Sequence, residues 1–149
     1  MYDGGEIIIV NNIIFNNNRA DHASIKGRPC IVLSDYNDKM TMIPLTSSKP
    51  KSRRKNNYFV EIKGEDIESE RFGFKSKKIE YSNVSSMFQK PLRHSEVLAY
   101  VKLKRYFELL KEIENMRLER NRLCSECYNE IYQDLEYQRK TLELIFKKN

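Results

Sequence analysis

The distribution of glycine and proline limits what this chain can fold into more than any other feature. All 5 glycines and all 4 prolines lie before residue 92, and neither occurs from there to residue 149. These residues end helices and shape turns, so the first part is divided into short segments and the last part is free to form long helices. The sequence predicts a mainly β fold with α: a small β-barrel in residues 1–92 and a long C-terminal helix or helical hairpin in residues 93–149.

The segments of the first part are short and apolar, and turn signals separate them at intervals of about eight to twelve residues, which is typical of a small barrel or sandwich. The predicted strands are residues 5–10, 30–33, 40–45, 58–62, 72–74 and 77–84, with residues 13–15 as a candidate extension of the first. Pro44 predicts an edge position or a bulge near the end of its strand, because proline cannot donate to a strand ladder.

Apolar residues of the last part recur at helical spacing in two groups. The first group is Leu98, Val101, Leu109, Ile113 and Met116, and the second is Tyr128, Ile131, Leu135, Leu142 and Ile145. A single helix here would be roughly 75–80 Å long and would need a partner, either its own second half or another chain. Cys124 and Ser125 mark the expected turn of a hairpin.

The charge of the chain favours a polyanionic partner. The net charge is +6, and residues 1–94 hold 16 Lys and Arg against 11 Asp and Glu, which leaves +5 on the predicted barrel. No run of about eighteen apolar residues exists, so no membrane span is predicted. The N-terminus lacks a secretory pattern and the 3 cysteines suit a reducing compartment, so we expect a cytoplasmic protein.

One arginine and a cluster of hydroxyls are the first candidates for chemistry. Pro29 pushes Arg28 towards an extended conformation, and Gly27 lets the backbone approach a neighbour, so Arg28 is a fixed cation at the mouth of a strand. Thr46, Ser47 and Ser48 end the next strand and can donate to phosphate oxygens. If the two strands form a hairpin, Arg28 lies near Thr46.

A basic segment follows these hydroxyls. Lys49, Lys51, Arg53, Arg54 and Lys55 precede two aromatic residues, a composition suited to following a nucleic-acid backbone. Arg19, in the long upstream loop, is a candidate for the opposite wall of such a site. The histidines and cysteines are too scattered for a zinc site, and no phosphate-binding or dinucleotide-binding glycine motif is present, so neither a metal nor a cofactor is predicted.

Three segments resemble the MazF/PemK toxins of bacterial toxin–antitoxin systems. They are Gly5-Glu-Ile-Ile-Ile-Val10, Gly27-Arg-Pro-Cys-Ile-Val-Leu-Ser34 and Met42-Ile-Pro-Leu-Thr-Ser47, and the last is also similar to the ToxN-type toxins. The resemblance spans about residues 4–92. It implies a small CcdB/MazF-like barrel of the Src-homology-3 type and metal-independent cleavage of RNA. Arg28 and Thr46 fall on the family's conserved arginine and threonine, and Asn83 falls where some members carry a glutamine near the substrate.

The expected function is therefore that of a toxin endoribonuclease. The 2′-hydroxyl of single-stranded RNA would attack the adjacent phosphate, leaving a 2′,3′-cyclic phosphate and a 5′-hydroxyl. The resemblance also implies a homodimer and a cognate antitoxin, either protein or RNA. The alternatives are a non-catalytic RNA- or protein-binding barrel with a helical dimerisation tail, and a protein in which the tail is the functional part.

Overall fold

A computed structural model gives the fold and describes residues 2–11, 27–36, 38–47, 49, 58–68, 79–91, 95–119 and 126–147. Its strands are β1 (Glu6–Val10), β2 (Arg28–Tyr36), β3 (Lys39–Thr46), β4 (Phe59–Ile62), β5 (Ile67–Glu68), β6 (Glu80–Asn83), β7 (Phe88–Lys90) and β8 (Val97–Val101). Its helices are η2 (Gly64–Asp66), η3 (Val84–Ser86), α1 (Leu103–Glu119) and α2 (Glu126–Lys147). The strands predicted at residues 13–15 and 72–74 lie outside the described residues.

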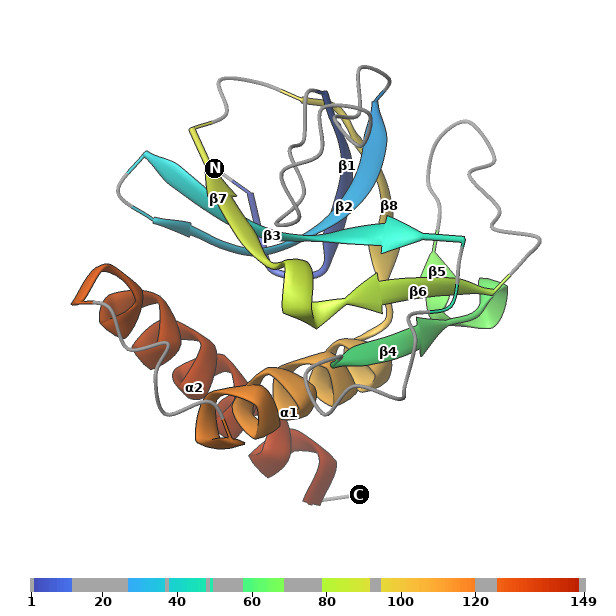
Figure 1. The fold of residues 1–149 in the computed structure, drawn as a ribbon. Helices are drawn as coiled ribbons and strands as arrows, with labels where there is room; N and C mark the ends of the chain where they lie inside the picture. Colours follow the sequence, from blue (N-terminus) through green and yellow to red (C-terminus); the bar gives the residue numbers. More distant parts are fainter. Residues whose placement is uncertain are drawn as a thin grey trace.

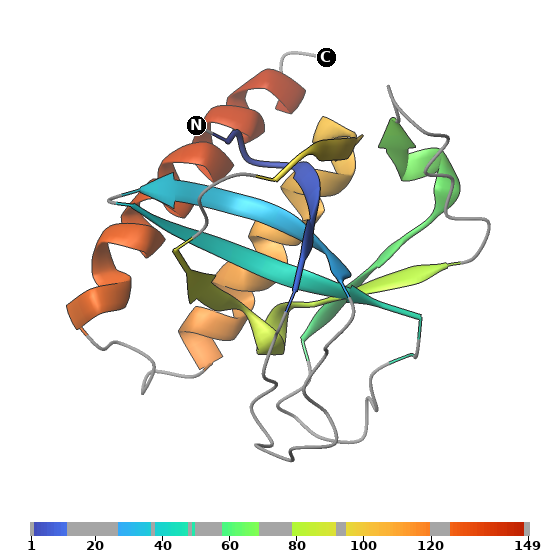
Figure 2. The ribbon, with the colours of Figure 1, turned by 90° about the horizontal axis from the view of Figure 1, so that it is seen from above.

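The described strands form one antiparallel sheet in the order β4-β6-β3-β2-β1-β8-β5, and β7 pairs with β3. The sheet curls into a half barrel, with α1 and α2 on one side of it (Figure 1; Figure 2). The prediction of a mainly β chain that ends in helices is confirmed.

Alternation along the strands gives the sheet two apolar faces. One face carries Ile7, Ile31 and Ile43, which join the larger core cluster with the buried residues of both helices. The other face carries a smaller cluster of six buried residues, including Ile8 and Cys30. We call this second side, which faces away from α1 and α2, the open face.

The C-terminal part is a helical hairpin, so the alternative of one continuous helix is wrong. Helix α1 ends at Glu119 and α2 begins at Glu126, and the turn predicted at Cys124 and Ser125 lies outside the described residues. Helix α1 buries Tyr106, Leu109, Leu110, Ile113 and Met116, and α2 buries Ile131, Tyr132, Leu135 and Leu142. Most of these are residues that the helical spacing identified.

The helical prediction for Leu98 and Val101 is wrong. Both residues lie on β8, which pairs with β1 and with β5, so the sheet extends beyond residue 92 and the first long helix begins at Leu103. A short continuous apolar run cannot be assigned to helix or strand by its periodicity alone. Here the edges of β1 and β5 offer hydrogen-bond partners, and these decide the conformation.

A buried polar network fixes the helices to the sheet. The Tyr106 hydroxyl donates to Gln138 Oε1 over 2.6 Å, and Gln138 Nε2 donates to the carbonyl oxygen of Leu33 on β2 over 3.0 Å. Burial raises the pKa of Tyr106 far above its ordinary value, so its hydroxyl keeps its proton. The network therefore connects α1, α2 and β2 in a single orientation.

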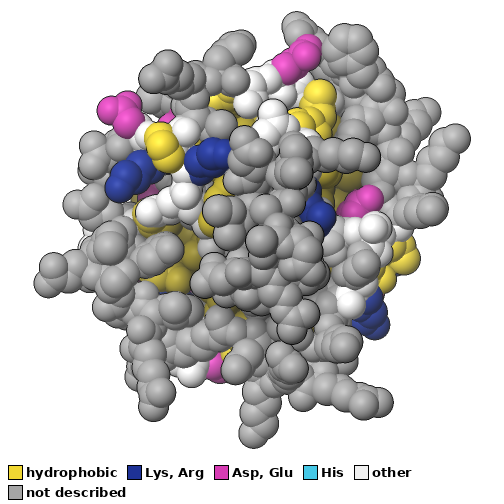
Figure 3. All heavy atoms as spheres, turned by 45° about the horizontal axis from the view of Figure 1, so that its top comes forward, with side chains coloured by type: hydrophobic (Ala, Val, Ile, Leu, Met, Phe, Trp, Pro, Cys, Tyr) yellow, Lys and Arg dark blue, Asp and Glu magenta, His cyan; other side chains and the backbone are white. Residues whose placement is uncertain are grey.

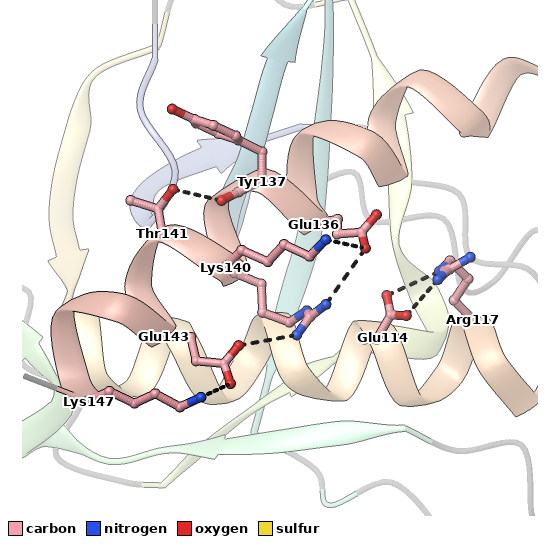
Figure 4. Close-up of polar contacts among 9 residues, drawn as sticks. Glu114, Arg117, Glu136, Tyr137, Lys140, Thr141, Glu143 and Lys147 are labelled. Carbon is pink, nitrogen blue, oxygen red and sulfur yellow. Dashed lines mark hydrogen bonds and ion pairs between the residues drawn. The ribbon is translucent and has the colours of Figure 1, made fainter.

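The outer faces of the helices carry pairs of charges one turn apart. Figure 4 shows Glu136 paired with Lys140, Glu143 with Lys147 and Glu114 with Arg117. Such exposed pairs each contribute little to stability. No helix among the described residues combines the length and the apolar content that a bilayer crossing requires.

The β2–β3 hairpin is longer than the sequence predicts. Pairing runs from Cys30 opposite Pro44 to Tyr36 opposite Lys39, with a register shift between Val32 and Ser34. Pro44 falls where the far side of β3 changes partner, because β7 pairs with residues 40–42 and β6 with residues 45 and 46. The missing N–H of proline is tolerated at such an interruption of the ladder. The predicted edge position is wrong, because β3 has partners on both sides, and the register shift of the hairpin lies at Val32 and Ser34 rather than at Pro44.

Candidate functional site

Arg28 begins β2 and is held there by its neighbours. It pairs with Val10 of β1, and it is half-buried. A Cβ atom added to Gly27 would come closer than 3.0 Å to Ile9 Cγ2 and to Asn11 Oδ1, so any other residue here would require these two side chains to move. The predicted close approach at Gly27 is thus present, and it fixes the backbone beside Arg28.

Arg28 and Thr46 lie at the same end of the hairpin, where β2 and β3 part. The last pair of the ladder is Cys30 with Pro44, and each site residue lies two positions beyond it. Beyond that pair, Arg28 lies beside β1, opposite Val10, whereas Thr46 lies beside β6, opposite Tyr81. Figure 1 shows the two strands diverging. We call this end, from Cys30–Pro44 outward to Arg28 and Thr46, the strand fork.

Both side chains of the strand fork belong to the open face. Arg28 shares the parity of Cys30, and Thr46 shares that of Pro44, and side chains two positions apart project from the same face of a strand. Both are half-buried and so keep some exposure to solvent. The hairpin therefore places both residues at one end, where the two strands have already parted, and the closeness of Arg28 to Thr46 stays a prediction.

Cationic side chains surround the thiol next to the strand fork. Burial raises the pKa of Cys30 to about 12, while Arg28 and Lys90 act in the opposite direction through their positive charge. The Lys90 ammonium also donates to the carbonyl oxygen of Asn11 over 2.7 Å. This part of the open face is thus electropositive and has a deeply buried, unreactive thiol beneath it.

A row of side chains extends the site across β6 and β4. Tyr81 lies opposite Thr46 on one side and opposite Glu61 on the other, which places the three on the same face. Phe59 contacts Tyr81 edge to face, with ring centroids 5.9 Å apart. Asn83 pairs with Phe59 in the register, and its buried Oδ1 accepts no hydrogen bond from the part of the chain that the structure describes.

The sequence prediction included Asn83 but missed Glu61 and Tyr81. The available signal was alternation, because β4 reads half-buried, buried, half-buried, buried along Phe59–Ile62. That alternation identifies Phe59 and Glu61 as one face. It does not show that β6 inserts between β4 and β3, and only this pairing brings the residues to Thr46.

The remaining predicted site residues divide into two groups. Ser47 and Lys49 follow Thr46 directly and are exposed. Ser48, Lys51, Arg53, Arg54, Lys55 and Arg19 lie outside the described residues.

The described residues of the strand fork include no metal-ligand cluster, and a pocket is found elsewhere, on the helices. Within the described part of the chain, no group of three or more His, Cys, Asp or Glu side chains is placed to hold a metal ion. An open pocket of about 370 Å³ lies between α1 and α2 and is lined by Glu108, Lys111, Glu112, Glu114, Asn115 and Arg139. It is on the helical side of the molecule, away from the strand fork.

Figure 3 shows the surface with the top of Figure 1 turned towards the viewer, and a few basic and acidic side chains lie there among yellow hydrophobic areas. The fold and this row define a class: a small, mainly β protein with a curled antiparallel sheet, a helical hairpin on one side and a polar and aromatic row on the other. No protein-family model matches the chain, and no curated protein matches it significantly. The resemblance to the MazF/PemK toxins therefore stays a prediction from the sequence segments that begin at Gly5, Gly27 and Met42.

Proposed function

We propose that this protein is a metal-independent endoribonuclease of the toxin type that cleaves single-stranded RNA. The observation that carries the proposal is the strand fork, in which a half-buried arginine at the start of β2 and a half-buried threonine at the end of β3 lie on the same face of the sheet. The proposed CcdB/MazF-like form of the barrel, a cognate antitoxin and a homodimer belong to the same proposal.

The chemistry uses a nucleophile that the substrate brings. The 2′-oxygen of a ribose bonds to the adjacent phosphorus and loses its proton, and the bond from phosphorus to the 5′-oxygen breaks as that oxygen gains one. The products are a 2′,3′-cyclic phosphate and a 5′-hydroxyl. The protein must hold the phosphate and stabilise the charge that gathers on its non-bridging oxygens, which is electrostatic catalysis.

Arg28 and Thr46 have separate roles in this scheme. The guanidinium of Arg28 is always charged and presents several N–H donors, which suits the non-bridging oxygens of a phosphate. The Thr46 hydroxyl donates a hydrogen bond to the same phosphate from the other arm of the strand fork. Ser47, Lys49 and the basic segment that follows would track the RNA backbone on either side.

The test compares the purified wild-type protein with Arg28→Ala and Thr46→Val on unmodified RNA in the presence of a chelator. Losing one such contact costs about 3–4 kcal/mol of transition-state stabilisation, so we expect Arg28→Ala to cut at least about 100-fold more slowly. Lys104→Ala, which removes an exposed cation from α1, is the matched control. Cleavage by Arg28→Ala at the wild-type rate refutes the assignment, and RNA binding by the wild-type protein without cleavage supports the non-catalytic alternative.

A further inference from the structure

An aromatic pair on the open face lies beside the strand fork and belongs to neither apolar cluster. The rings of Phe59 and Tyr81 meet edge to face, with an interplanar angle of 74°, and both residues are half-buried. Their strand neighbours Val60 and Ser82 point the other way and are buried in the larger core. The pair therefore keeps ring surface outside both apolar clusters.

The register connects this pair directly to the proposed phosphate site. Tyr81 lies between Thr46 and Glu61, so the row from Thr46 to Glu61 spans two inter-strand spacings, or about 10 Å. That length is comparable with the reach from a phosphate to the far edge of its base. A nucleotide whose phosphate lies in the strand fork can thus lay its base over the rings.

The charges along the row set the direction of such a nucleotide. The cation of Arg28 lies at one end, beyond Thr46, and the carboxylate of Glu61 at the other. A phosphate is attracted to the first end and repelled from the second, so the backbone belongs at the strand fork and the base at β4. Aromatic faces stack on any nucleobase, which makes them a common platform for single-stranded nucleic acid.

We infer that Phe59 and Tyr81 form the stacking platform for the base next to the scissile phosphate, and that this platform favours bases with an exocyclic amino group. The inference rests on the proposed function for the position of the phosphate. The preference follows from Glu61, because a carboxylate accepts hydrogen bonds and the Glu61 carboxylate makes no hydrogen bond or ion pair within the described part of the chain. Adenine, cytosine and guanine offer exocyclic amino donors, whereas the one free donor of uracil is a ring N–H flanked by two carbonyl oxygens, which a carboxylate repels.

The experiment measures stacking separately from cleavage. The probe is a short single-stranded RNA of mixed sequence with 2′-O-methyl ribose, which cannot supply the nucleophile, and with the fluorescent base 2-aminopurine placed at each position in turn. We expect the wild-type protein to quench the fluorescence at one position. The ring-removing variants are Phe59→Leu and Tyr81→Leu, and Tyr81→Phe keeps the ring. The control is Tyr137→Leu, since Tyr137 is an aromatic residue of α2 with 72% of its surface exposed.

Losing one base–aromatic stack weakens binding about 5- to 150-fold. We expect that loss, and loss of quenching, in both leucine variants, with wild-type behaviour in Tyr81→Phe and Tyr137→Leu. Leucine variants that bind and quench like the wild type overturn the platform. If circular dichroism shows that the leucine variants do not fold, the 2-aminopurine scan of the wild-type protein still tests the platform. Absence of quenching at every position of the RNA overturns it.

The outcomes separate this inference from the proposed function. Quenching at one position without cleavage of unmodified RNA overturns the nuclease and supports the platform. Cleavage of unmodified RNA without quenching at any position supports the nuclease and overturns the platform. For the preference, we expect 2′-O-methyl homopolymers of A and C to bind more tightly than that of U, and the difference to narrow in Glu61→Gln, whose amide both donates and accepts. Equal binding of the three by the wild type overturns the preference for amino groups.

Discussion

Substitution of Gly4 by alanine should loosen the attachment of the helical hairpin to the sheet. A Cβ atom at this position would come closer than 3.0 Å to the Tyr106 hydroxyl and to Gln138 Oε1. Neither group can yield easily, because Tyr106 is 3% exposed and its hydroxyl donates to Gln138, which in turn donates to the carbonyl oxygen of Leu33. The new methyl group must therefore displace the network itself.

The expected cost has two parts. Overpacking a well-packed core costs about 1–3 kcal/mol, and the loss of one buried hydrogen bond costs about 0.5–1.5 kcal/mol. Together they predict a fall of roughly 2–4 kcal/mol in the free energy of unfolding. For a chain of this size about 2–4 °C of Tm is lost for each kcal/mol, so Tm should fall by roughly 5–15 °C.

Thermal and urea unfolding followed by circular dichroism measure this fall. Gly64→Ala is the matched control, because Gly64 is exposed in η2 and its φ is not positive, and we expect it to leave Tm nearly unchanged. The sharper test is a double-mutant cycle with Tyr106→Phe, which removes the hydroxyl that the methyl group strikes. Gly4→Ala should cost at least about 1 kcal/mol less in that background. Equal costs in both backgrounds, or equal Tm for the two glycine variants, would refute the reasoning.

Two further predictions concern the thiol below the strand fork and the packing of α2. Burial raises the pKa of Cys30 from 9.0 to about 12, so ionisation above pH 9.0 favours the unfolded state and stability falls as the pH rises towards 12. Cys30→Ala should lessen that alkaline loss in urea midpoints measured across this range, and a pH-independent difference from the wild type contradicts the assignment. Leu135→Ala should cost about 2–5 kcal/mol because Leu135 is 4% exposed, whereas Leu144→Ala, at a site 64% exposed, should change stability by less than about 0.5 kcal/mol. Equal urea midpoints for these two variants would contradict the packing of α2.

The strands that the sequence predicts are those with strong local patterns. β1, the β2–β3 hairpin and β4 are apolar segments bounded by turn residues, and all are present. β5 and β7 contain only 2 and 3 residues, so no period can be read from them, and they exist because β8 and β3 offer free edges. The sequence predicts helix for Leu98 and Val101 of β8, because a run of five largely apolar residues is compatible with the period of a helix and with that of a strand.

The candidate site divides in the same way between local and non-local information. Arg28 and Thr46 follow from local chemistry, namely a proline that restricts its neighbour and hydroxyls at the end of a strand. Tyr81 and Glu61 reach Thr46 only because β6 lies between β3 and β4, although β4 precedes β6 in the chain. Nothing in residues 59–62 or 80–83 alone specifies that order, because the same alternation would fit a strand at either edge of the sheet.

The position of β8 decides which experiment can distinguish a functional site on the sheet from one on the C-terminal helices. If the C-terminal part were an independent appendage, its deletion would show whether the barrel acts alone. The sheet, however, takes β8 between β1 and β5, and both helices bury residues in the core that Ile7 and Ile31 share. Deleting residues 95–149 would expose that core and unfold the chain, so lost cleavage in such a variant says nothing about where the activity resides. Only point substitutions on the open face, at positions the core does not need, distinguish a site on the sheet from one on the helices.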